Sequence, residues 1–214
     1  MERQRHPTRS RERILAAATK EFAAKGLAGS RTRNIARRAG LNEQLIFHCF
    51  KSKEGLYRSV MNEQLSRIAT LLESREHLSL GTHLATGFET LCDHPDRLRM
   101  WQWEALADAS DLIAADERRS FLRAEASRLN RAKADRNLPE DIDAELMLIA
   151  SIALRSIPLL LPQLVRLLTG FQSANPVFQR RWSRFLRTLG DTITRSSTLP
   201  RVRTPQSARL RTRR

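Results

Sequence analysis

Residues 31–50, RTRNIARRAGLNEQLIFHCF, hold three adjacent polar side chains that can read the edges of DNA bases. A glutamine such as Gln44 can form a bidentate pair with adenine, and a glutamate such as Glu43 can accept from cytosine. Each good pair contributes about 1–3 kcal/mol of discrimination against the wrong base. Glu43 can equally repel phosphate and so select against unwanted contacts. Together with Asn42, these residues predict a reading surface if they lie at the exposed end of a helix.

Ala36, Gly40 and Ile46 have the spacing of a helix-turn-helix. A small residue lets two helices approach, a glycine accepts the positive φ of a tight turn, and a branched residue fills the angle between the helices. In such a motif the second helix lies in the DNA major groove, with its N-terminal residues toward the bases. Helical corners that bind no DNA also show this spacing. Residues outside the motif are therefore needed to distinguish a DNA-binding helix-turn-helix from such a corner.

The elements that must hold this motif are indicated by apolar periodicity and by capping residues. We expect helices at 11–25, 30–39, 42–47 and 52–74, with Ser10, Ser30, Asn42 and Ser52 at their starts and Gly26 and Gly40 at two ends. Helices of about eight residues are unstable alone in water, so the two short ones must share a core with the first and fourth. The fold class is therefore all-α.

The net charge of +15 is concentrated at the two ends of the chain. Residues 1–58 carry 14 Lys and Arg against 5 Asp and Glu, and residues 197–214 carry 6 Arg and no acid. Clustered cations neutralise phosphates, so a balanced body with basic ends is typical of a protein that binds a polyanion. A charge run can also be a solvated surface, and charge alone leaves both interpretations open.

Residues 10–57 resemble the N-terminal domain of the TetR family of bacterial transcriptional repressors. The resemblance lies in RERILAAATKEFAAKG, SRTRNIARRAGLN and LIFHCFKSKEGLY, which occur in the order and at the spacing of that domain. It implies a basic arm at 1–9, a three-helix helix-turn-helix domain at 10–57, and a larger helical domain at 58–196. It further implies a homodimer that binds a palindromic operator of double-stranded DNA, acts as a repressor, and is released by a small-molecule effector. The sequence itself does not give the sign of regulation, so activation stays open as an alternative.

The resemblance assigns DNA contacts residue by residue. Ser30 stands where the family has a Thr or Ser that caps the second helix and binds phosphate, and Arg33 matches a basic contact position. Phe47 and His48 match the aromatic pair after the recognition helix, and Lys53 matches a lysine expected on the DNA backbone. The full expected set is Arg9, Arg11, Ser30, Arg31, Arg33, Asn42, Glu43, Gln44, Phe47, His48 and Lys53.

Two hydroxyls of the family pattern are missing. Leu45 stands where the family commonly has Thr, and Phe47 stands where it has a Tyr whose hydroxyl reaches a phosphate. The arginines of the basic arm, Arg3 and Arg5 among them, are the expected replacements for these phosphate contacts.

Beyond residue 75, the pattern predicts helices at 80–93, 95–108, 111–136, 141–168 and 176–196, about nine helices in all. The resemblance implies an effector among the first three of these and a four-helix dimer interface from the last two. The available apolar side chains favour a small hydrophobic effector and no cofactor. The expected lining residues are Phe88, Cys92, Met100, Trp101, Trp103, Phe121 and Met147. Trp101 and Trp103 cannot face the same way on one helix, so at most one should point inward.

Residues 146–168 are the most apolar stretch and are nearly long enough to span a membrane. Arg155, Arg166 and two prolines argue against a span and favour an interface helix. Pro158 and Pro162 are expected to kink that helix or to split it in two.

Other function classes have weaker support. No catalytic nucleophile with base and orienting group, and no Gly-rich phosphate loop, can be recognised, so an enzyme is not expected. Two cysteines without metal-ligand spacing, and a start without an apolar signal segment, favour a cytoplasmic protein with no metal site. The alternative that remains is a constitutive nucleoid-type DNA-binding protein without effector. The basic tail at 197–214 is expected to be disordered.

Overall fold

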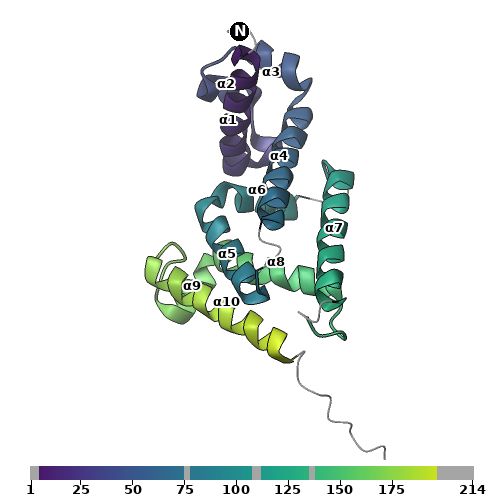
Figure 1. Ribbon diagram of the computed structural model, residues 1–214. Helices are drawn as coiled ribbons and strands as arrows, with labels where there is room; N and C mark the ends of the chain where they lie inside the picture. The colour runs from purple at the N-terminus through teal and green to yellow at the C-terminus, as the bar shows by residue number, and fades with distance from the viewer. Residues whose placement is uncertain (1–4, 75–77, 108–111, 135–137, 197–214) are drawn as a thin grey trace, which may run out of the picture.

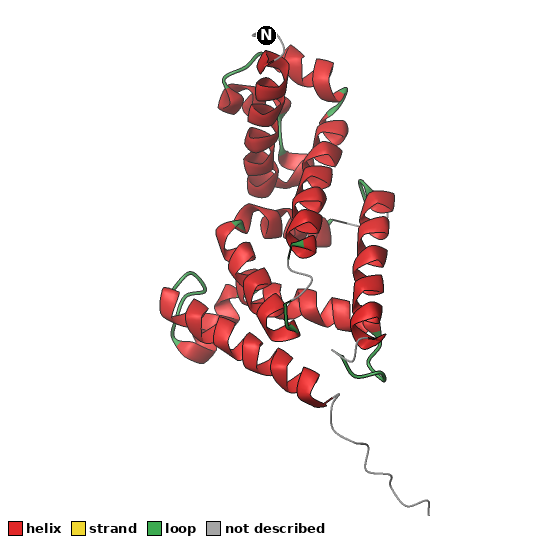
Figure 2. Ribbon diagram, viewed as in Figure 1, coloured by secondary structure: helices red, strands yellow, loops and turns green. Residues whose placement is uncertain are grey.

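Ten helices and no strand make up the described residues of the computed structural model, which are 5–74, 78–107, 112–134 and 138–196 (Figure 1, Figure 2). The predicted all-α class is confirmed. Arg3, the tail at 197–214 and the expected ends of two helices near 108–111 and 136 lie outside these residues. In chain order the helices are α1 (Arg5–Gly29), α2 (Thr32–Ala39), α3 (Glu43–Phe50), α4 (Lys53–Glu73), α5 (Leu80–Asp93), α6 (Pro95–Leu106), α7 (Ala115–Ala134), α8 (Ala144–Leu160), α9 (Pro162–Thr169) and α10 (Pro176–Ser196).

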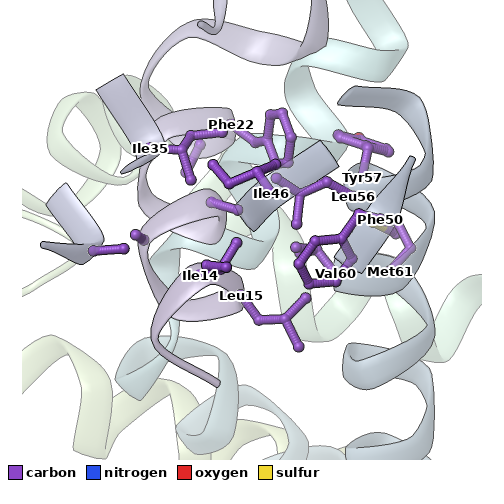
Figure 3. Packing of buried hydrophobic residues seen from close by; sticks show 14 of the residues in the cluster. Ile14, Leu15, Phe22, Ile35, Ile46, Phe50, Leu56, Tyr57, Val60 and Met61 are labelled. Atoms are coloured by element: carbon purple, nitrogen blue, oxygen red, sulfur yellow. The ribbon is translucent and has the colours of Figure 1, made fainter. Parts of the chain in front are cut away.

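The first four helices share one apolar cluster (Figure 3). Phe22 of α1, Ile35 of α2 and Ile46 of α3 are fully buried and meet Leu56 and Val60 of α4. Burying one such side chain contributes roughly 1.5–3 kcal/mol relative to leaving it in water. The two eight-residue helices are therefore held by packing against α1 and α4, as their shortness required.

The first helix begins earlier than expected and breaks where expected. It starts at Arg5, so Ser10 lies inside α1 and the prediction that Ser10 is an N-cap is wrong. Pro7 does not stop the helix because it falls in the first turn, where its missing N–H is not needed. Gly26, with φ 65° and ψ 180°, interrupts α1 before a final short turn that ends at Gly29.

A second apolar cluster joins α5, α9 and α10 through Phe88, Val165 and Leu186 among others. The backbones of α5 and α10 approach closely at Gly81 and Gly190. A Cβ on Gly81 would overlap the backbone oxygen of Arg187, and a Cβ on Gly190 would overlap the backbone of Gly81. The two glycines thus allow a crossing that no larger residue would permit.

Helices α4 and α6 connect the N-terminal cluster to the larger domain: α4 packs against α7, and α6 packs against α1, α5 and α8. Helix α4 runs without a break through residue 57, where the domain boundary was predicted. Met100 of α6 is fully buried in the N-terminal cluster, and Trp101 packs against the same cluster. Side chains from beyond residue 58 therefore complete the core of the N-terminal bundle.

The apolar stretch 146–168 is split, which gives ten helices where about nine were expected. The break falls at Leu161, Pro162 occupies the first turn of α9, and Pro158 is accommodated within α8. Of the two prolines, Pro162 thus marks the split. Among the described helices, none by itself has the length and hydropathy of a membrane span, and α8 and α9 reach them only when joined across a bend of 75°.

Candidate nucleic-acid interface

The turn between α2 and α3 has the predicted geometry. Gly40 adopts φ 63° and ψ 41°, in the left-handed region that favours glycine. Its amide donates to the Arg37 oxygen at 3.1 Å, and the amide of Leu41 donates to the Ala36 oxygen at 3.0 Å, which closes the end of α2. Ala36 and Ile46 are both buried. The roles predicted for the small residue, the glycine and the branched residue are confirmed.

Asn42 begins α3 and caps it as predicted. Its Oδ1 accepts from the amide of Gln44 at 2.9 Å, which satisfies one of the free donors at the helix start. The helix runs on to Phe50, three residues beyond the expected end. Since Oδ1 of Asn42 is used by the cap, the side chain of Gln44 is the freer polar group at this end of α3.

The hydrogen-bond partner of Glu43 could not be predicted from the sequence. Thr32, the first residue of α2, donates its hydroxyl to Glu43 Oε1 at 2.5 Å, and both side chains are half-buried. The carboxylate also lies in the first turn of α3, where a negative charge is favoured by the helix dipole. The two residues are eleven apart in sequence, so only a placement of both helix starts side by side would have paired them.

A concavity of about 580 Å³ opens next to Glu43 and is predominantly basic. Arginine side chains outnumber the single carboxylate in its wall, so the local potential favours an anionic group. The lining residues are Arg31, Arg33, Asn34, Ala36, Arg37, Leu41 and Glu43.

Most of the expected DNA contacts are exposed side chains from the end of the molecule where α2, α3 and the start of α1 meet (Figure 1). Phe47 keeps 45% of its surface exposed, so its ring is accessible at this end of the molecule. The guanidinium carbon of Arg11 lies 4.9 Å from the ring centroid of Phe50, a cation–π contact that orients the arginine. The exposed members are Arg9, Arg11, Arg31, Arg33, Asn42, Gln44, Phe47 and His48.

Ser30 does not cap α2, and that prediction is wrong. The N-cap residue is Arg31, which makes no side-chain cap bond, whereas the buried Ser30 hydroxyl donates to the Leu27 oxygen at 2.7 Å. The short turn after the break in α1 leaves this carbonyl without a helical partner, and the hydroxyl satisfies it. Lys53 Nζ donates to the Ser30 oxygen at 3.4 Å, so the ammonium lies beside the loop before α2. Its contact with the DNA backbone stays a prediction.

Polar bonds fix α2 against α1 at both ends. Asn34 donates to Glu21 Oε1 at 3.0 Å, and Lys25 Nζ lies 3.3 Å from the same oxygen. Burial works to raise the pKa of Glu21, but the bonds from Asn34 and Lys25 outweigh it and hold the pKa below its ordinary value. At the other end, Arg13 Nη2 donates to the Ala39 oxygen at 2.6 Å. The helix before the turn is thereby held in place.

A partly buried network joins α4 to α6 and α7. Tyr57 donates its hydroxyl to Glu104 Oε1 at 2.7 Å, and Arg118 donates to both Glu104 oxygens at 2.7 and 2.9 Å. Burial, and then the Glu104 carboxylate, raise the pKa of Tyr57 above its ordinary value. No sequence pattern signalled this network, because its members are spread over three helices.

The seven residues expected to line an effector site do not form one group. Phe88 and Cys92 pack in the cluster of α5, α9 and α10, where burial raises the pKa of the Cys92 thiol to about 11. Phe121 is half-buried on α7, and Met147 is buried on α8. Their contact with an effector stays a prediction.

The other three expected lining residues lie on α6 and face the N-terminal bundle. Met100 and Trp101 pack in or against its core. Trp103 donates its indole N–H to the Ala23 oxygen at 3.1 Å, and its ring covers Gly26. An effector contact from these residues also stays untested.

A family model described as bacterial regulatory proteins, tetR family, matches residues 14–60. The matched segment runs from α1 into α4 and contains the complete helix-turn-helix. Residues 14–60 therefore form a DNA-binding domain of the TetR type. The match supports a DNA-binding transcriptional regulator of that family.

Similar proteins extend this likeness beyond the matched segment. The HTH-type transcriptional repressor SCO4008 of Streptomyces coelicolor is 27% identical over 174 residues, which cover 78% of this chain and 86% of the relative. Salmonella enterica GusR is 18% identical, with a TM-score of 0.66 over 87% of this chain and 95% of its own. The regulator FadR from Bacillus subtilis, solved in complex with stearoyl-CoA, is 18% identical, with a TM-score of 0.62 over 83% of this chain and 97% of its own. The fold of the larger domain is thus also found in other regulators.

Proposed function

We propose that this TetR-family protein is a repressor that binds a palindromic operator as a homodimer and leaves it when a small molecule binds to the larger domain. The observation that carries the DNA-binding part is the start of α3. There Gln44 is exposed, while Asn42 caps the helix and Glu43 is bonded to Thr32. This arrangement supports Gln44 as the base reader and its two neighbours as residues that position it.

Phosphate contacts are proposed for the arginines around the reader. Arg31 and Arg33 are exposed at the basic concavity, and Arg9 and Arg11 extend the positive surface along α1. Such contacts carry no sequence information but set the register of the protein on the duplex. The missing hydroxyl at Phe47 is compensated in this proposal by these cations.

Dimerisation through the last helices is supported by their exposed apolar side chains. Contiguous exposed apolar surface marks interaction sites in soluble proteins. A twofold dimer would present two recognition helices to successive major grooves about 34–36 Å apart, which requires a palindrome or near-palindrome. The side chains concerned are Leu146, Ile149, Leu161, Leu164, Leu167, Leu168, Val177 and Phe185.

Release by an effector is supported by the contacts that join the two domains. The carboxylate of Glu104 on α6 bonds to Tyr57 on α4 and to Arg118 on α7. A ligand that moved α6 or α7 would have to strain or break these bonds. A complete switch requires a difference of about 5.5 kcal/mol in effector affinity between the two states.

The test is binding of the purified protein, at near-physiological salt, to DNA upstream of its own gene and to a shuffled duplex of equal length. A regulator should prefer its operator by about 10³-fold or more. Equal binding to both duplexes, followed by no enriched sequence in a selection from genomic fragments, would contradict the proposal and favour a general DNA-binding protein.

A further inference from the structure

Arg155 is a partly buried cation of the larger domain, on α8. Its Nε donates to the backbone oxygen of Ser151 at 2.9 Å, so the side chain folds back along its own helix. Burial lowers the pKa of the guanidinium below its ordinary value. Helix α8 packs against both α5 and α7, so this charge lies where three helices meet.

The neighbouring helix is shaped to receive this side chain. Gly87 of α5 lies directly under Arg155, and a Cβ there would overlap Arg155 Cδ and come within 3.0 Å of Nη1. Gly87 lies within a helix, where glycine is less favourable than alanine by roughly 1 kcal/mol. The glycine therefore makes room for the arginine at a cost to the stability of α5.

The charge of Arg155 is not neutralised by an adjacent carboxylate. Among the described residues, no carboxylate oxygen lies within 4.0 Å of its guanidinium. The acidic group that acts on it electrostatically is Glu125 of α7, which is 8% exposed. That carboxylate already faces Arg128, with 3.4 Å between Glu125 Oε1 and Arg128 Nη1. Glu73, the other carboxylate near Arg128, is largely exposed.

Apolar side chains accompany these charges on the same helix faces. Met147, Ser151 and Arg155 are spaced four apart and line one face of α8. Phe121 and Glu125 are likewise four apart and share a face of α7. The residues that these faces offer are thus a buried methionine, a half-buried aromatic ring and a cation without a full counter-charge.

We infer that Arg155 binds the anionic group of the effector, which is an apolar molecule that carries a carboxylate. The inference rests on the proposed function and narrows its effector to a chemical class. A carboxylate would supply the two oxygen acceptors that a guanidinium pairs with in bidentate fashion. The apolar body would lie along Met147 and Phe121. This changes the expectation of a purely hydrophobic effector.

The experiment measures ligand binding without DNA, by thermal shift and by tryptophan fluorescence. The probes are octanoate, dodecanoate, hexadecanoate and phenylacetate, each below its micellar concentration, with the alcohol of the same carbon skeleton as a neutral control. At least one acid should raise the melting temperature of the wild type, and its alcohol should bind at least about tenfold more weakly, as expected for a charge-assisted contact.

Three variants localise the effect. Arg155→Met should weaken binding of the acid at least about tenfold and leave the alcohol unchanged. Gly87→Ala should weaken the acid while keeping the charge, because its Cβ displaces the arginine. Arg123→Met, which removes an exposed arginine from α7, should change neither. Without ligand, the melting temperature of Arg155→Met should equal or exceed that of the wild type, because a partly buried charge without an adjacent carboxylate has been removed.

Three outcomes would overturn the inference: no acid binds the wild type, the wild type and Arg155→Met bind the same acid equally, or Arg155→Met loses acid and alcohol alike together with its stability. Operator binding of both proteins is measured separately. A wild type that bound the acid but preferred no DNA sequence would remove the proposed function and leave the ligand assignment in place.

Discussion

The indole Nε1 of Trp103 donates a hydrogen bond of 3.1 Å to the backbone oxygen of Ala23. The bond joins α6 to the last regular turn of α1 and brings the indole ring over Gly26. Lys20 and Asp96 form an ion pair of 3.7 Å between the same two helices. Helix α6 is therefore attached to the bundle that contains the helix-turn-helix. A movement of α6 would act directly on α1 through these two contacts.

Gly26→Ala should lower the free energy of unfolding by about 1–3 kcal/mol, because φ 65° with ψ 180° is a conformation that essentially only glycine adopts. The new Cβ would also lie 3.0 Å from Trp103 Cδ2. Gly170→Ala is the control for a positive φ in the left-handed region, since Gly170 has φ 74° and ψ −10° with open space around it. Urea denaturation should show a larger loss for Gly26→Ala. Equal losses would mean that neither the backbone conformation at Gly26 nor the contact with Trp103 adds to the cost.

Tyr57 should not ionise near its ordinary pKa of about 10 while the protein is folded. Its folded-state pKa is raised, so the stability it contributes is complete below pH 10 and is lost as the pH rises further. Tyr57 is the one tyrosine of the chain, so tyrosinate absorbance reports on it alone. The signal should appear together with alkaline unfolding, and Tyr57→Phe should lack it. Tyrosinate formation near pH 10 in protein that keeps its helical circular dichroism would refute this.

Gln44→Ala should reduce the preference for the operator by about 1–3 kcal/mol and leave affinity for shuffled DNA unchanged, because a base contact is lost. Arg33→Ala should weaken binding to both duplexes and reduce its salt dependence, because a phosphate contact is lost. Fluorescence anisotropy at several salt concentrations separates the two effects. If Gln44→Ala weakened both duplexes equally, its role as reader would be wrong.

Leu167→Glu should convert the proposed dimer to monomer and lower operator affinity by at least about tenfold, because a buried charge in an apolar interface is costly. Leu106→Glu is the control, since Leu106 is as exposed, 82% against 83%, but lies on α6. Sedimentation velocity measures the oligomeric state. A dimer that persisted with glutamate at 167 would place the interface elsewhere.

The parts of the fold that follow from short-range chemistry could be predicted from the sequence. Gly40 accepts the left-handed turn, and Asn42 and Ser52 cap α3 and α4 with their side-chain oxygens. The predicted N-caps at Ser10 and Ser30 were wrong because other nearby residues determine the structure there. Pro7 permits an earlier helix start before Ser10, and the Leu27 carbonyl takes the hydroxyl of Ser30.

The contacts that could not be predicted join residues far apart in the chain. Thr32 and Glu43 meet only because two helix starts lie together. Tyr57, Glu104 and Arg118 come from three helices. Apolar periodicity and capping residues predict where each helix lies in the sequence, but they do not predict which polar side chains of different helices form hydrogen bonds. The same holds for Arg155, which in the sequence counted only as an argument against a membrane span.

Helix α4 continues for 21 residues from Lys53, next to the end of the recognition helix, into the larger domain, where it packs against α7. At 1.5 Å per residue this is a rod of roughly 30 Å. A tilt of about 5° at the distal end therefore sweeps the proximal end through roughly 3 Å, the length of one hydrogen bond. In the proposed dimer, a slight readjustment of α7 against α4 would therefore displace each recognition helix by about the length of one contact with the operator.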